Sequence, residues 1–472
     1  MLGSKLETYF KKIMTIPHGS GHEEWLADYI EYFAQQHGYD YVRDVMNNII
    51  IYVPATKGYE DHETVALQAH LDMVCDVEPG YDYDFYNDPI KLKKVKGYYT
   101  AEHTTLGADD GAGVAMILTF IDENKNHPAL ECIFTVAEEV NMYGAIHIDH
   151  SRIHAKRMIS LDDDLFGVTT VASAGCTEMT LSKTLHPQEN KDPAYKIYIG
   201  DLLGGHSGDE IHKGRGNAPH ILARACKSLL DHGIDVRVAR FTSGNKINAI
   251  PLNGEVVFAS ISDLKDIKAQ LKTFEASIKE EYAESDPDLK LYLDEVEWND
   301  VYPGDESEAI LNTIFLSPNG ALRMSNTIKD HPITSVNLGV VSTYDHVLKL
   351  NYSIRSDLES ERNLVADQIS TLGSFFTMSV DRFGEFDAMT YQSKSPLRRK
   401  MKSLYKEMFH KVMKERMMHA ALETGIFQKR HPDMDIVTLG PELENIHTYK
   451  ERMHISSFKL TYRFLKKLIG EL

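Results

Sequence analysis

The spacing of apolar residues in the first part of the chain predicts helices that alternate with short strands. Residues 4–38 carry apolar side chains at helical intervals and end at Gly38, which indicates two amphipathic helices. Another helical pattern opens within 104–113. Four apolar runs have the length and composition of buried strands: 48–53, 64–68, 130–137 and 157–161. A helix between two such strands favours βαβ connections, so we expect a largely parallel, mixed sheet flanked by helices.

The pattern changes after residue 175. Strand candidates then alternate with two long helical segments: strands at 195–199, 236–241, 255–260 and 347–354, and helices at 217–230 and 264–282. Beyond residue 384 the first kind of pattern returns, with helices at 396–413 and 455–469 and a strand at 434–439. At 472 residues the chain is longer than single cores usually grow. We therefore predict an α/β domain built from residues 1–185 and 384–472, with an inserted α+β domain at 186–383 that contains an antiparallel sheet.

Composition excludes several classes of partner. The net charge of -19 would repel nucleic acid and anionic lipid, and no basic patch offsets it, so we expect neither partner. The longest apolar stretch, 114–121, is far shorter than the ~20 residues that span a membrane. Residues 1–7 lack the apolar core of a signal peptide, which predicts a cytoplasmic protein. The four cysteines form no CxxC pair, so we expect reduced thiols.

Polar residues follow three of the predicted strands. The first strand leads to His70 and Asp72, the second to Glu138 and Glu139, and the third to Asp162. His70 and Asp72 are two positions apart and therefore share a face in extended backbone. Because ligands of open α/β sheets bind beyond the carboxyl ends of the strands, we expect these side chains to converge at a site.

The glycine-rich segment 104–113 leaves two interpretations open. Small residues at a helix start let an anion approach the free N–H groups, as in phosphate-binding loops. However, the Lys-Ser/Thr ending of a P-loop is missing, and Asp109 and Asp110 would repel phosphate. Their carboxylates suit a cation better.

A pair of divalent cations that share a carboxylate needs about five protein ligands of the His, Asp and Glu types. Five candidates lie at the ends of predicted elements: His70, Asp109, Glu139, Asp162 and His454. Glu138 is then left free, and a free carboxylate beside metal-bound water is what a general base requires. Spacing alone does not select these five from 70 acids and 22 histidines.

Six motifs together resemble the bacterial aminoacyl-histidine dipeptidases, also called Xaa-His or cytosol nonspecific dipeptidases. They occur in the order of that family: Gln-Ala-His-Leu-Asp-Met-Val at 68–74, Thr-Thr-Leu-Gly-Ala-Asp at 104–109, Ala-Glu-Glu at 137–139, Gly-Gly-His-Ser-Gly at 204–208, Asn-Ala-Ile-Pro at 248–251 and Met-His-Ile at 453–455. The family is similar to carnosinases, aminoacylases and glutamate carboxypeptidases of the co-catalytic zinc peptidase clan. The resemblance covers nearly the whole chain.

The resemblance implies two Zn²⁺ ions per subunit, with Co²⁺ or Mn²⁺ as substitutes. One ion is expected on His70 and Asp162 and the other on Glu139 and His454, with Asp109 bridging them. Asp162 is assigned because it directly follows the apolar strand, and a register shifted by one residue is the alternative. The family also implies a cis peptide bond between Asp109 and Asp110, where relatives often carry Asn in place of Asp110.

Two further carboxylates receive roles from the same resemblance. Asp72 is expected to hydrogen-bond the far nitrogen of His70, which would fix the tautomer of the imidazole. Glu138 is expected to take a proton from the water between the metals and to give it to the leaving amine.

The inserted domain resembles the family's lid. His206 would donate to the oxyanion of the tetrahedral intermediate, although a histidine in a glycine-rich turn is the plainer interpretation. Asn248 and Arg355 resemble residues that hold the substrate's C-terminal carboxylate; a strand-end salt bridge is the alternative for Arg355. The lid implies a homodimer in which His206 reaches the neighbour's site, unless the insert contains two lid halves and a monomer suffices.

Other clusters have ligand-type residues but less support. The segment 147–150 matches no motif, and the aspartates at 162–164 lack the alternating spacing of a calcium loop. The segment 447–451 departs from the His-Ser-Pro-Asp/Glu pattern of relatives, and 423–425 is placed near the substrate.

The expected function is a dizinc dipeptidase of unblocked dipeptides, Xaa-His among them. A deacylase or carboxypeptidase of N-acyl amino acids and a non-catalytic metal- or peptide-binding homologue remain alternatives.

Overall fold

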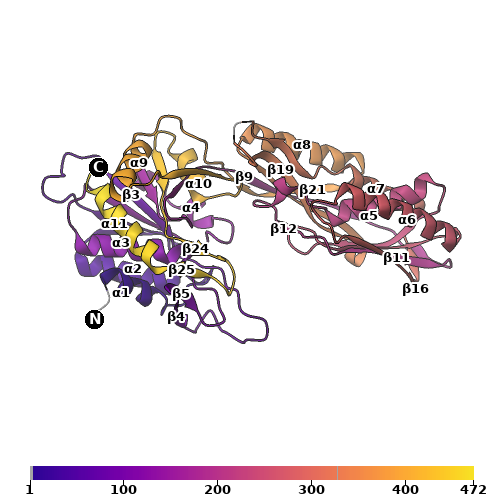
Figure 1. Cartoon of the computed structure of the whole chain (residues 1–472), viewed down its shortest axis with the longest axis horizontal. Helices are drawn as coiled ribbons and strands as arrows, with labels where there is room; N and C mark the ends of the chain where they lie inside the picture. Colours follow the sequence, from indigo (N-terminus) through magenta and orange to yellow (C-terminus); the bar gives the residue numbers. More distant parts are fainter. Residues whose placement is uncertain (1–3, 327) are drawn as a thin grey trace. The chain divides into compact units, whose positions relative to one another are not determined.

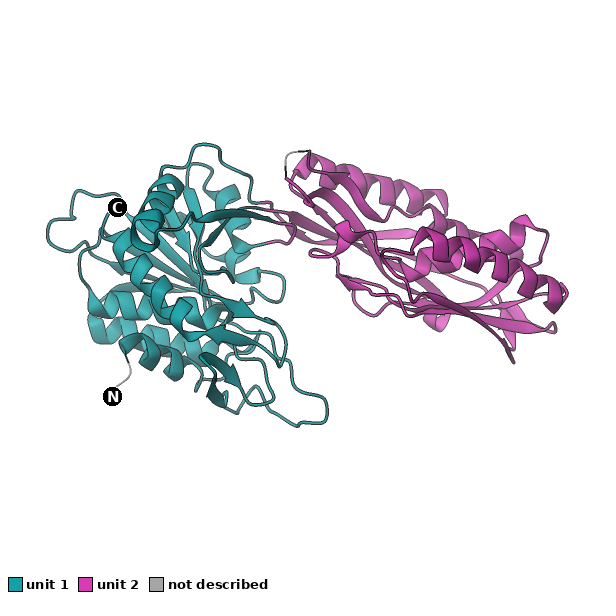
Figure 2. Ribbon diagram, in the orientation of Figure 1, with its two compact units in different colours: residues 1–172, 389–417, 422–472 teal, residues 173–388, 418–421 magenta. Residues whose placement is uncertain are grey.

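The computed structural model describes residues 4–326 and 328–472. The chain forms two compact units (Figure 2). Unit 1 contains the residues up to 172 together with 389–417 and 422–472, and unit 2 contains 173–388 and 418–421. Among the described residues, no helix is long and apolar enough to cross a membrane.

The units begin and end at different residues from those expected. Unit 2 starts at Ser173 and not at 186, ends at Ala388 and not at 383, and includes Met418–Ala421. The reason is strand β9 (Gly175–Thr184), which pairs along its whole length with β20 (Val347–Ser356) of unit 2. A strand belongs with the sheet that takes its hydrogen bonds, so the boundary lies before β9.

Unit 1 is built on a mixed sheet (Figure 1). The strand order is β1-β2-β6-β3-β7-β23. Strands β6, β3, β7 and β23 run parallel to one another, whereas β2 is antiparallel to both of its neighbours, β1 and β6. These strands span Asp40–Arg43 (β1), Ile49–Val53 (β2), Val65–His70 (β3), Leu130–Thr135 (β6), Arg157–Ser160 (β7) and Asp435–Thr438 (β23). The largely parallel sheet confirms the predicted fold class of this domain.

Five helices bury their apolar faces in the core of unit 1: α1 (Lys5–Ile13), α2 (Glu24–His37), α3 (Ala108–Glu123), α9 (Pro396–Phe409) and α11 (Ile455–Ile469). Helix α1 starts with a capping box between Ser4 and Glu7. Its Phe10 packs against Phe458 of α11, with ring centroids 5.4 Å apart. The two ends of the chain therefore share one core.

Smaller elements complete unit 1. A second sheet has the order β24-β25-β5-β4, and β22 pairs with β8. Their bounds are Leu92–Val95 (β4), Tyr98–Ala101 (β5), Val168–Ser173 (β8), Lys414–Met418 (β22), Leu443–Glu444 (β24) and Arg452–His454 (β25). Two short helices, α4 (Tyr143–His147) and α10 (Glu423–Arg430), pack together, and a 3-10 turn spans His150–Arg152.

Unit 2 contains an antiparallel sheet of order β16-β11-β15-β13-β19-β20-β9-β21, with β18 paired to β19. Its remaining strands are Ala194–Gly200 (β11), Arg237–Ser243 (β13), Gly254–Ala259 (β15), Lys290–Val296 (β16), Gly320–Met324 (β18), Pro332–Ser342 (β19) and Ser379–Phe386 (β21). Two short pairs lie outside it: β10 (Gln188–Glu189) with β17 (Asp300–Val301), and β12 (Gly205–His206) with β14 (Ala249–Ile250). This sheet confirms the predicted α+β insert.

Four helices pack on the sheet of unit 2 around a second apolar core: α5 (Ala218–Asp231), α6 (Leu264–Glu281), α7 (Gly304–Leu316) and α8 (Glu359–Phe375). Short 3-10 turns span Ile211–Lys213 and Tyr344–His346. The sequence did not predict α7 and α8. Pro303 is the N-cap of α7, and Asp305 and Glu306 occupy its first turn, where carboxylates are favourable.

Candidate functional site

His70 ends β3 on the face of the sheet opposite to the main apolar core. Leu67 and Ala69 point into that core, so Gln68 and His70, which alternate with them, face the other side. His70 is buried and lies at the carboxyl end of a strand with parallel neighbours on both sides. A site is expected at this end of a parallel sheet.

The carboxylate of Asp109 lies between two groups of side chains. Its Oδ1 is 3.2 Å from Nε2 of His70, and that nitrogen is 3.9 Å from Oδ1 of Asp162. Its Oδ2 is 3.2 Å from Nε2 of His447, which lies 3.0 Å from Oε1 of Glu139. Two triads of potential metal ligands therefore share Asp109. With ligand bonds of about 2.0–2.1 Å, neighbouring ligands of a tetrahedral ion lie about 3.3 Å apart, so this spacing fits two adjacent ions.

The predicted ligand His454 joins neither triad, and His447 takes the place expected for it. His454 ends β25 and caps α11, and its ring packs against Tyr98 with centroids 5.1 Å apart. None of the candidate ligand groups found within 4–326 and 328–472 includes His454. The motif favoured the histidine beside the last helix. The histidine that reaches Asp109 lies earlier, in the segment 447–451 that departs from the pattern of relatives.

Asp162, the first of three consecutive aspartates, lies in the cluster, whereas the other two face Arg416. The Nη2 atom of Arg416 is 3.0 Å from Oδ1 of Asp163 and also contacts Asp164. Gly440, just beyond β23, approaches so closely that a Cβ there would lie 1.4 Å from the carbonyl oxygen of Asp163. This packing fixes the register of the three aspartates and supports Asp162 over Asp163 as the site residue.

Asp72 supports the loop of Glu138 and Glu139 as well as His70. Its Oδ1 accepts the N–H of Glu138 at 2.9 Å, and its Oδ2 accepts the N–H of Glu139 at 3.1 Å and the hydroxyl of Ser20 at 2.8 Å. The Nδ1 of His70 lies 3.0 Å from the carbonyl oxygen of Asp72 and 3.5 Å from its Oδ1. The carbonyl is thus the nearer acceptor, which differs from the predicted contact. Either acceptor leaves Nε2 facing Asp109.

Two residues near the start of the chain, which the sequence did not single out, hold the same loop. Ser20 reaches Asp72 through its hydroxyl. Glu23 is buried, and its Oε1 accepts the N–H of Gly21 at 2.9 Å and the N–H of Ala137 at 3.1 Å. Ala137 has a φ of 53°, an uncommon conformation for a residue with a side chain, directly before Glu138. The backbone that presents Glu138 is therefore held at both ends.

The cluster holds more buried acid than base. Burial raises the pKa of Glu138 well above its ordinary range, and the charges of Glu139 and Asp162 add to this against the opposing charge of His70. Burial and the charge of Asp109 raise the pKa of Asp162 to about 7. The Oε1 of Glu139 is buried, and Nε2 of His447 lies 3.0 Å from it. A set of imidazoles and crowded carboxylates of this kind fits divalent ions of the zinc type.

The carboxylates around His447 also change the pKa of its imidazole. Burial opposes a charge on the ring, yet hydrogen bonds with Asp109 and Glu139 outweigh burial and raise the pKa of His447 to about 11. In the absence of metal, a proton on His447 thus offsets part of the negative charge. A metal ligand must be deprotonated, so protons and metal compete for this site.

The glycine-rich start of α3 is closed to external anions because an internal carboxylate fills it. Glu451 accepts the backbone N–H groups of four consecutive residues, Leu106, Gly107, Ala108 and Asp109. This contact excludes the phosphate-loop interpretation. The peptide bond between Asp109 and Asp110 is cis, as the resemblance implied.

Glu423, at the start of α10, is buried against the sheet. Its Oε2 accepts the Nε2–H of Gln68 at 2.7 Å and the hydroxyl of Thr135 at 2.6 Å. Thr135 lies directly opposite His70 in the parallel pair β3–β6. Burial raises the pKa of Glu423 to about 8. The sequence placed 423–425 near the substrate, whereas this side chain ties together the two strand ends that carry His70 and the Glu138 loop.

In unit 2, Arg355 lies on the sheet face opposite to the helices. Its neighbour Ile354 packs in the core beneath the helices, so Arg355 points the other way, beside its antiparallel partner Ser335 on β19. Arg355 is 8% exposed, and we find no hydrogen bond or ion pair that it makes within the described residues. Glu178 on the neighbouring strand β9 is near enough to interact with the charge of Arg355, but no hydrogen bond joins these two described side chains. A buried guanidinium without an acceptor is costly, so this side chain has donors free for an anionic ligand.

His419, which the sequence did not single out, lies next to Arg355. Its Nε2 is 2.7 Å from Oγ of Ser335, the residue opposite Arg355, and its Nδ1 is buried without a hydrogen-bond partner in the described chain. Burial, followed by the charge of Arg355, lowers the pKa of His419 to about 3, so the ring is neutral. No motif marks this histidine in the sequence.

His206 and Asn248 come together through a short strand pair in unit 2. His206 belongs to β12, which pairs with β14, and the N–H of Ser207 donates to the carbonyl oxygen of Asn248 at 2.8 Å. The Nδ1 of His206 lies 3.2 Å from Oδ2 of Asp209. The side chain of Asn248 is exposed and His206 is partly exposed, so both are accessible to a ligand.

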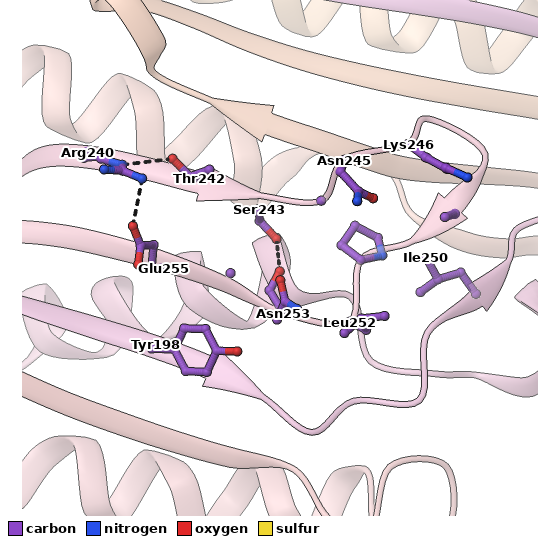
Figure 3. A pocket seen from close by; sticks show the side chains of 14 residues that line it. Tyr198, Arg240, Thr242, Ser243, Asn245, Lys246, Ile250, Leu252, Asn253 and Glu255 are labelled. Carbon is purple, nitrogen blue, oxygen red and sulfur yellow. Dashed lines mark hydrogen bonds and ion pairs between the residues drawn. The ribbon is translucent and has the colours of Figure 1, made fainter. Parts of the chain in front are cut away.

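The loop before β14 also borders a cavity of about 400 Å³ on unit 2 (Figure 3). Residues on either side of Asn248 line it, Asn245 and Lys246 on one side and Ile250 on the other. The arginine in its wall, Arg240, is paired with Glu255 at 3.0 Å. The charge of Arg240 is therefore already satisfied, whereas the guanidinium of Arg355 has no such ion pair among the described residues.

Comparison with known proteins places this arrangement in a family. The profile of Peptidase family M20/M25/M40 matches residues 66–471. The chain belongs to peptidase family M20/M25/M40. This result confirms the resemblance inferred from the six motifs, and the M20 match includes every residue of the two triads that share Asp109.

Individual M20 relatives match over almost the full length. A cytosol non-specific dipeptidase of Escherichia coli (strain K12) is 34% identical over 471 residues, which are 98% of this chain and 96% of that protein. The crystal structure of an aminoacylhistidine dipeptidase from Vibrio alginolyticus matches with a TM-score of 0.88 and 28% identity, covering 100% of this chain and 97% of that one. Aminopeptidase PepT from Bacillus cereus, at 16% identity and a TM-score of 0.55 over 99% and 98%, shares the fold alone.

Proposed function

We propose that this protein is a metallo-dipeptidase that hydrolyses unblocked dipeptides, Xaa-His dipeptides among them. The observation that carries the proposal is the carboxylate of Asp109, whose two oxygens face two separate triads of ligand-type residues. Family membership and the names of the Escherichia coli and Vibrio alginolyticus relatives support the reaction class.

The proposed metal centre holds two Zn²⁺ ions, with Co²⁺ or Mn²⁺ as substitutes. His70 and Asp162 would hold one ion, Glu139 and His447 the other, and Asp109 both. This set keeps four of the five ligands expected from the sequence and exchanges His454 for His447. When bound, the metal pair would polarise the scissile carbonyl and lower the pKa of the attacking water.

Glu138 is the proposed general base. Its backbone N–H is held by Asp72, and its carboxylate forms a third group of ligand-type side chains with His70 and Glu139, one member of each triad. It takes a proton from the attacking water and later gives it to the leaving amine. Burial raises the pKa of Glu138, and this favours the second half of the role, the return of the proton to the leaving amine.

Residues of unit 2 would recognise the C-terminal carboxylate of the substrate and the oxyanion that forms from its scissile carbonyl. Arg355, buried and unpaired, and Asn248 would bind the C-terminal carboxylate, and His206 would donate to the oxyanion of the transition state. A guanidinium fork matches a carboxylate with two parallel hydrogen bonds. An oxyanion donor is worth ~3 kcal/mol of transition-state stabilisation in comparable sites.

We also propose a cytoplasmic homodimer. The location follows the name of the Escherichia coli relative, which calls it cytosolic. For the dimer, apolar side chains gather on the outside of α7 and α8: Phe315, Leu316, Leu364 and Phe375 are all at least 45% exposed. Leu316 and Phe375 line one hollow together with Leu372, and an exposed apolar patch can mark an interaction site. Light scattering coupled to size-exclusion chromatography gives the mass, and a monomeric mass at micromolar concentration would overturn the dimer.

A panel of dipeptides tests the proposed function. Purified protein is assayed by chromatography on free Xaa-His dipeptides, N-acetylated dipeptides and N-acyl amino acids, with and without a chelator. We expect turnover of free dipeptides, loss of turnover with chelator and recovery with added Zn²⁺. Preference for the N-acyl amino acids would instead identify a deacylase, and absence of product from every substrate would identify a binding protein.

A further inference from the structure

We propose that Glu451 is a positioning residue that sets the affinity of the metal site formed by Asp109, Glu139 and His447. This inference rests on the proposed function, because it concerns the metals of the same centre. Neither the motifs nor the resemblance gave Glu451 a role.

Glu451 is completely buried, and its carboxylate is fully used by backbone donors. Its Oε2 accepts the N–H groups of Leu106 at 2.8 Å and Gly107 at 2.9 Å. Its Oε1 accepts those of Ala108 at 2.9 Å and Asp109 at 3.3 Å. Successive N–H groups that converge on one point form an anion-binding nest, and here the anion is part of the chain.

The nest fixes the position of the backbone from which the side chain of Asp109 extends. Gly107 adopts a φ of 73°, a conformation that glycine enters easily, and this turns four consecutive N–H groups toward Glu451. Asp109 is the last of the four donors. The backbone that carries the shared ligand is therefore fixed by the carboxylate of Glu451.

The backbone of Glu451 belongs to the turn that follows His447. The N–H of Glu451 donates to the carbonyl oxygen of Thr448 at 3.0 Å, which closes this turn. The N–H of Tyr449 donates to Oδ2 of Asp76 at 2.9 Å. The backbone carbonyl oxygen of Asp76 accepts the N–H of Thr105 at 3.0 Å, next to the nest. Glu451 and Asp76 thus join the turn of His447 to the segment of Asp109.

The two triads depend on this connection to different degrees. In the triad of Asp109, Glu139 and His447, two ligands lie on the segments that Glu451 joins. In the triad of His70, Asp109 and Asp162, only Asp109 does, because His70 and Asp162 follow strands β3 and β7 of the sheet. Loss of the Glu451 carboxylate should weaken the first site more than the second. Partners that orient metal ligands typically change metal affinity by about 10–100-fold when removed.

The test compares Glu451→Gln with Glu444→Gln. Glutamine has nearly the shape of glutamate, but its NH₂ group would face two N–H donors of the nest, so two hydrogen bonds are lost. Glu444 lies on the adjacent strand β24 and contacts Arg452 and Tyr98 at the surface, which makes it a matched control outside the metal centre. Metal per chain is measured after dialysis, and Zn²⁺ and Co²⁺ affinities of the apo proteins are measured by calorimetry.

We expect wild type and Glu444→Gln to hold two ions per chain. Glu451→Gln should keep one ion and bind the second about 10–100-fold more weakly, and excess metal should restore its kcat. A Glu451→Gln protein with two ions at wild-type affinities would overturn the inference. Far-ultraviolet circular dichroism checks folding. If this variant does not fold, Glu451→Asp, which keeps the charge but is one methylene shorter, is judged by the same criteria.

Failure of the inference and failure of the proposed function give different results. A wild-type protein that binds two ions, loses one on Glu451→Gln and cleaves no dipeptide would uphold the inference and overturn the function. An active wild type with an unchanged Glu451→Gln variant would do the reverse. A wild type that binds no metal would overturn both.

Discussion

The Nε2 atom of His447 lies 3.2 Å from Oδ2 of Asp109, although 338 positions separate the two residues. The contact identifies His447 as the histidine of the second triad. His447→Ala should therefore remove one metal ion and lower kcat/KM by at least about 100-fold, whereas His454→Ala should keep both ions. Metal analysis and steady-state kinetics on the two variants check this. Loss of an ion from His454→Ala but not from His447→Ala would reverse the assignment.

Glu138 and Glu139 are neighbours with different expected effects on replacement. Glu138→Gln should lower kcat by about 10²–10⁴-fold while both ions remain bound, because a general base contributes to the proton transfer alone. Glu139→Gln, its matched control, should lose metal. Kinetics and metal content are measured on the same preparations. A Glu138→Gln enzyme that retained most of its kcat would exclude the proposed role.

Asp72 accepts hydrogen bonds from two backbone N–H groups and a hydroxyl. Asp72→Asn replaces one accepting oxygen by a donor, so the loop of Glu138 should lose part of its support. We expect both metal affinity and kcat to fall by about 10–100-fold. Ser20→Ala removes only the hydroxyl and should cost about 1 kcal/mol of unfolding free energy. Calorimetry and thermal denaturation measure these effects, and equal losses in both variants would contradict the different roles.

Arg355 should govern recognition of the substrate's C-terminus. Arg355→Ala is expected to raise KM for free dipeptides by about 10–100-fold, since a charge-assisted hydrogen bond is worth about 1.5–3 kcal/mol. Dipeptide amides, which lack the carboxylate, should show little change. His419→Ala should produce a smaller rise with the same preference. Equal effects on dipeptides and their amides would argue against a carboxylate site.

The sequence predicted the strands that carry the site more reliably than the loops. Strands β3, β6 and β7 are short apolar runs buried on both faces, so local composition is sufficient to locate them. Helix α8 was missed because Arg362 and Ala366 are buried among polar positions, which blurs its apolar stripe. Strand β9 was also missed, although polar residues alternate with its buried apolar residues from Glu178 to Ser182, which is the pattern of a strand with one exposed face.

The choice between two histidines shows what the sequence could not settle. Both His447 and His454 lie in the last part of the chain, and a motif fixes the order of ligands better than their exact positions. The deciding contacts are long-range, from Glu451 to the nest before α3 and from His447 to Asp109. Only the fold reveals them.

The metal-free protein should become less stable as pH rises. The pKa of His447 is raised from its unfolded value of 6.5 to about 11, so its stabilising charge is complete below 6.5 and is lost toward 11. The pKa of Asp162 is raised from 3.8 to about 7, so its ionisation in that range also destabilises the fold. Thermal denaturation between pH 5 and pH 9 should show Tm falling for apo protein and staying level with Zn²⁺. A rise in apo Tm would contradict both shifts.

The hydrogen bonds of Ser20 and Glu23 connect the amino-terminal segment to the loop that carries Glu138. A variant in which both Ser20 and Glu23 are replaced by alanine would retain every metal-binding side chain and the core contacts of α1. It would nevertheless lack the hydrogen bonds to Asp72 and Ala137 that hold the loop of Glu138. Such a protein would bind metal and yet be a poor catalyst, so metal content alone does not show that a preparation is active.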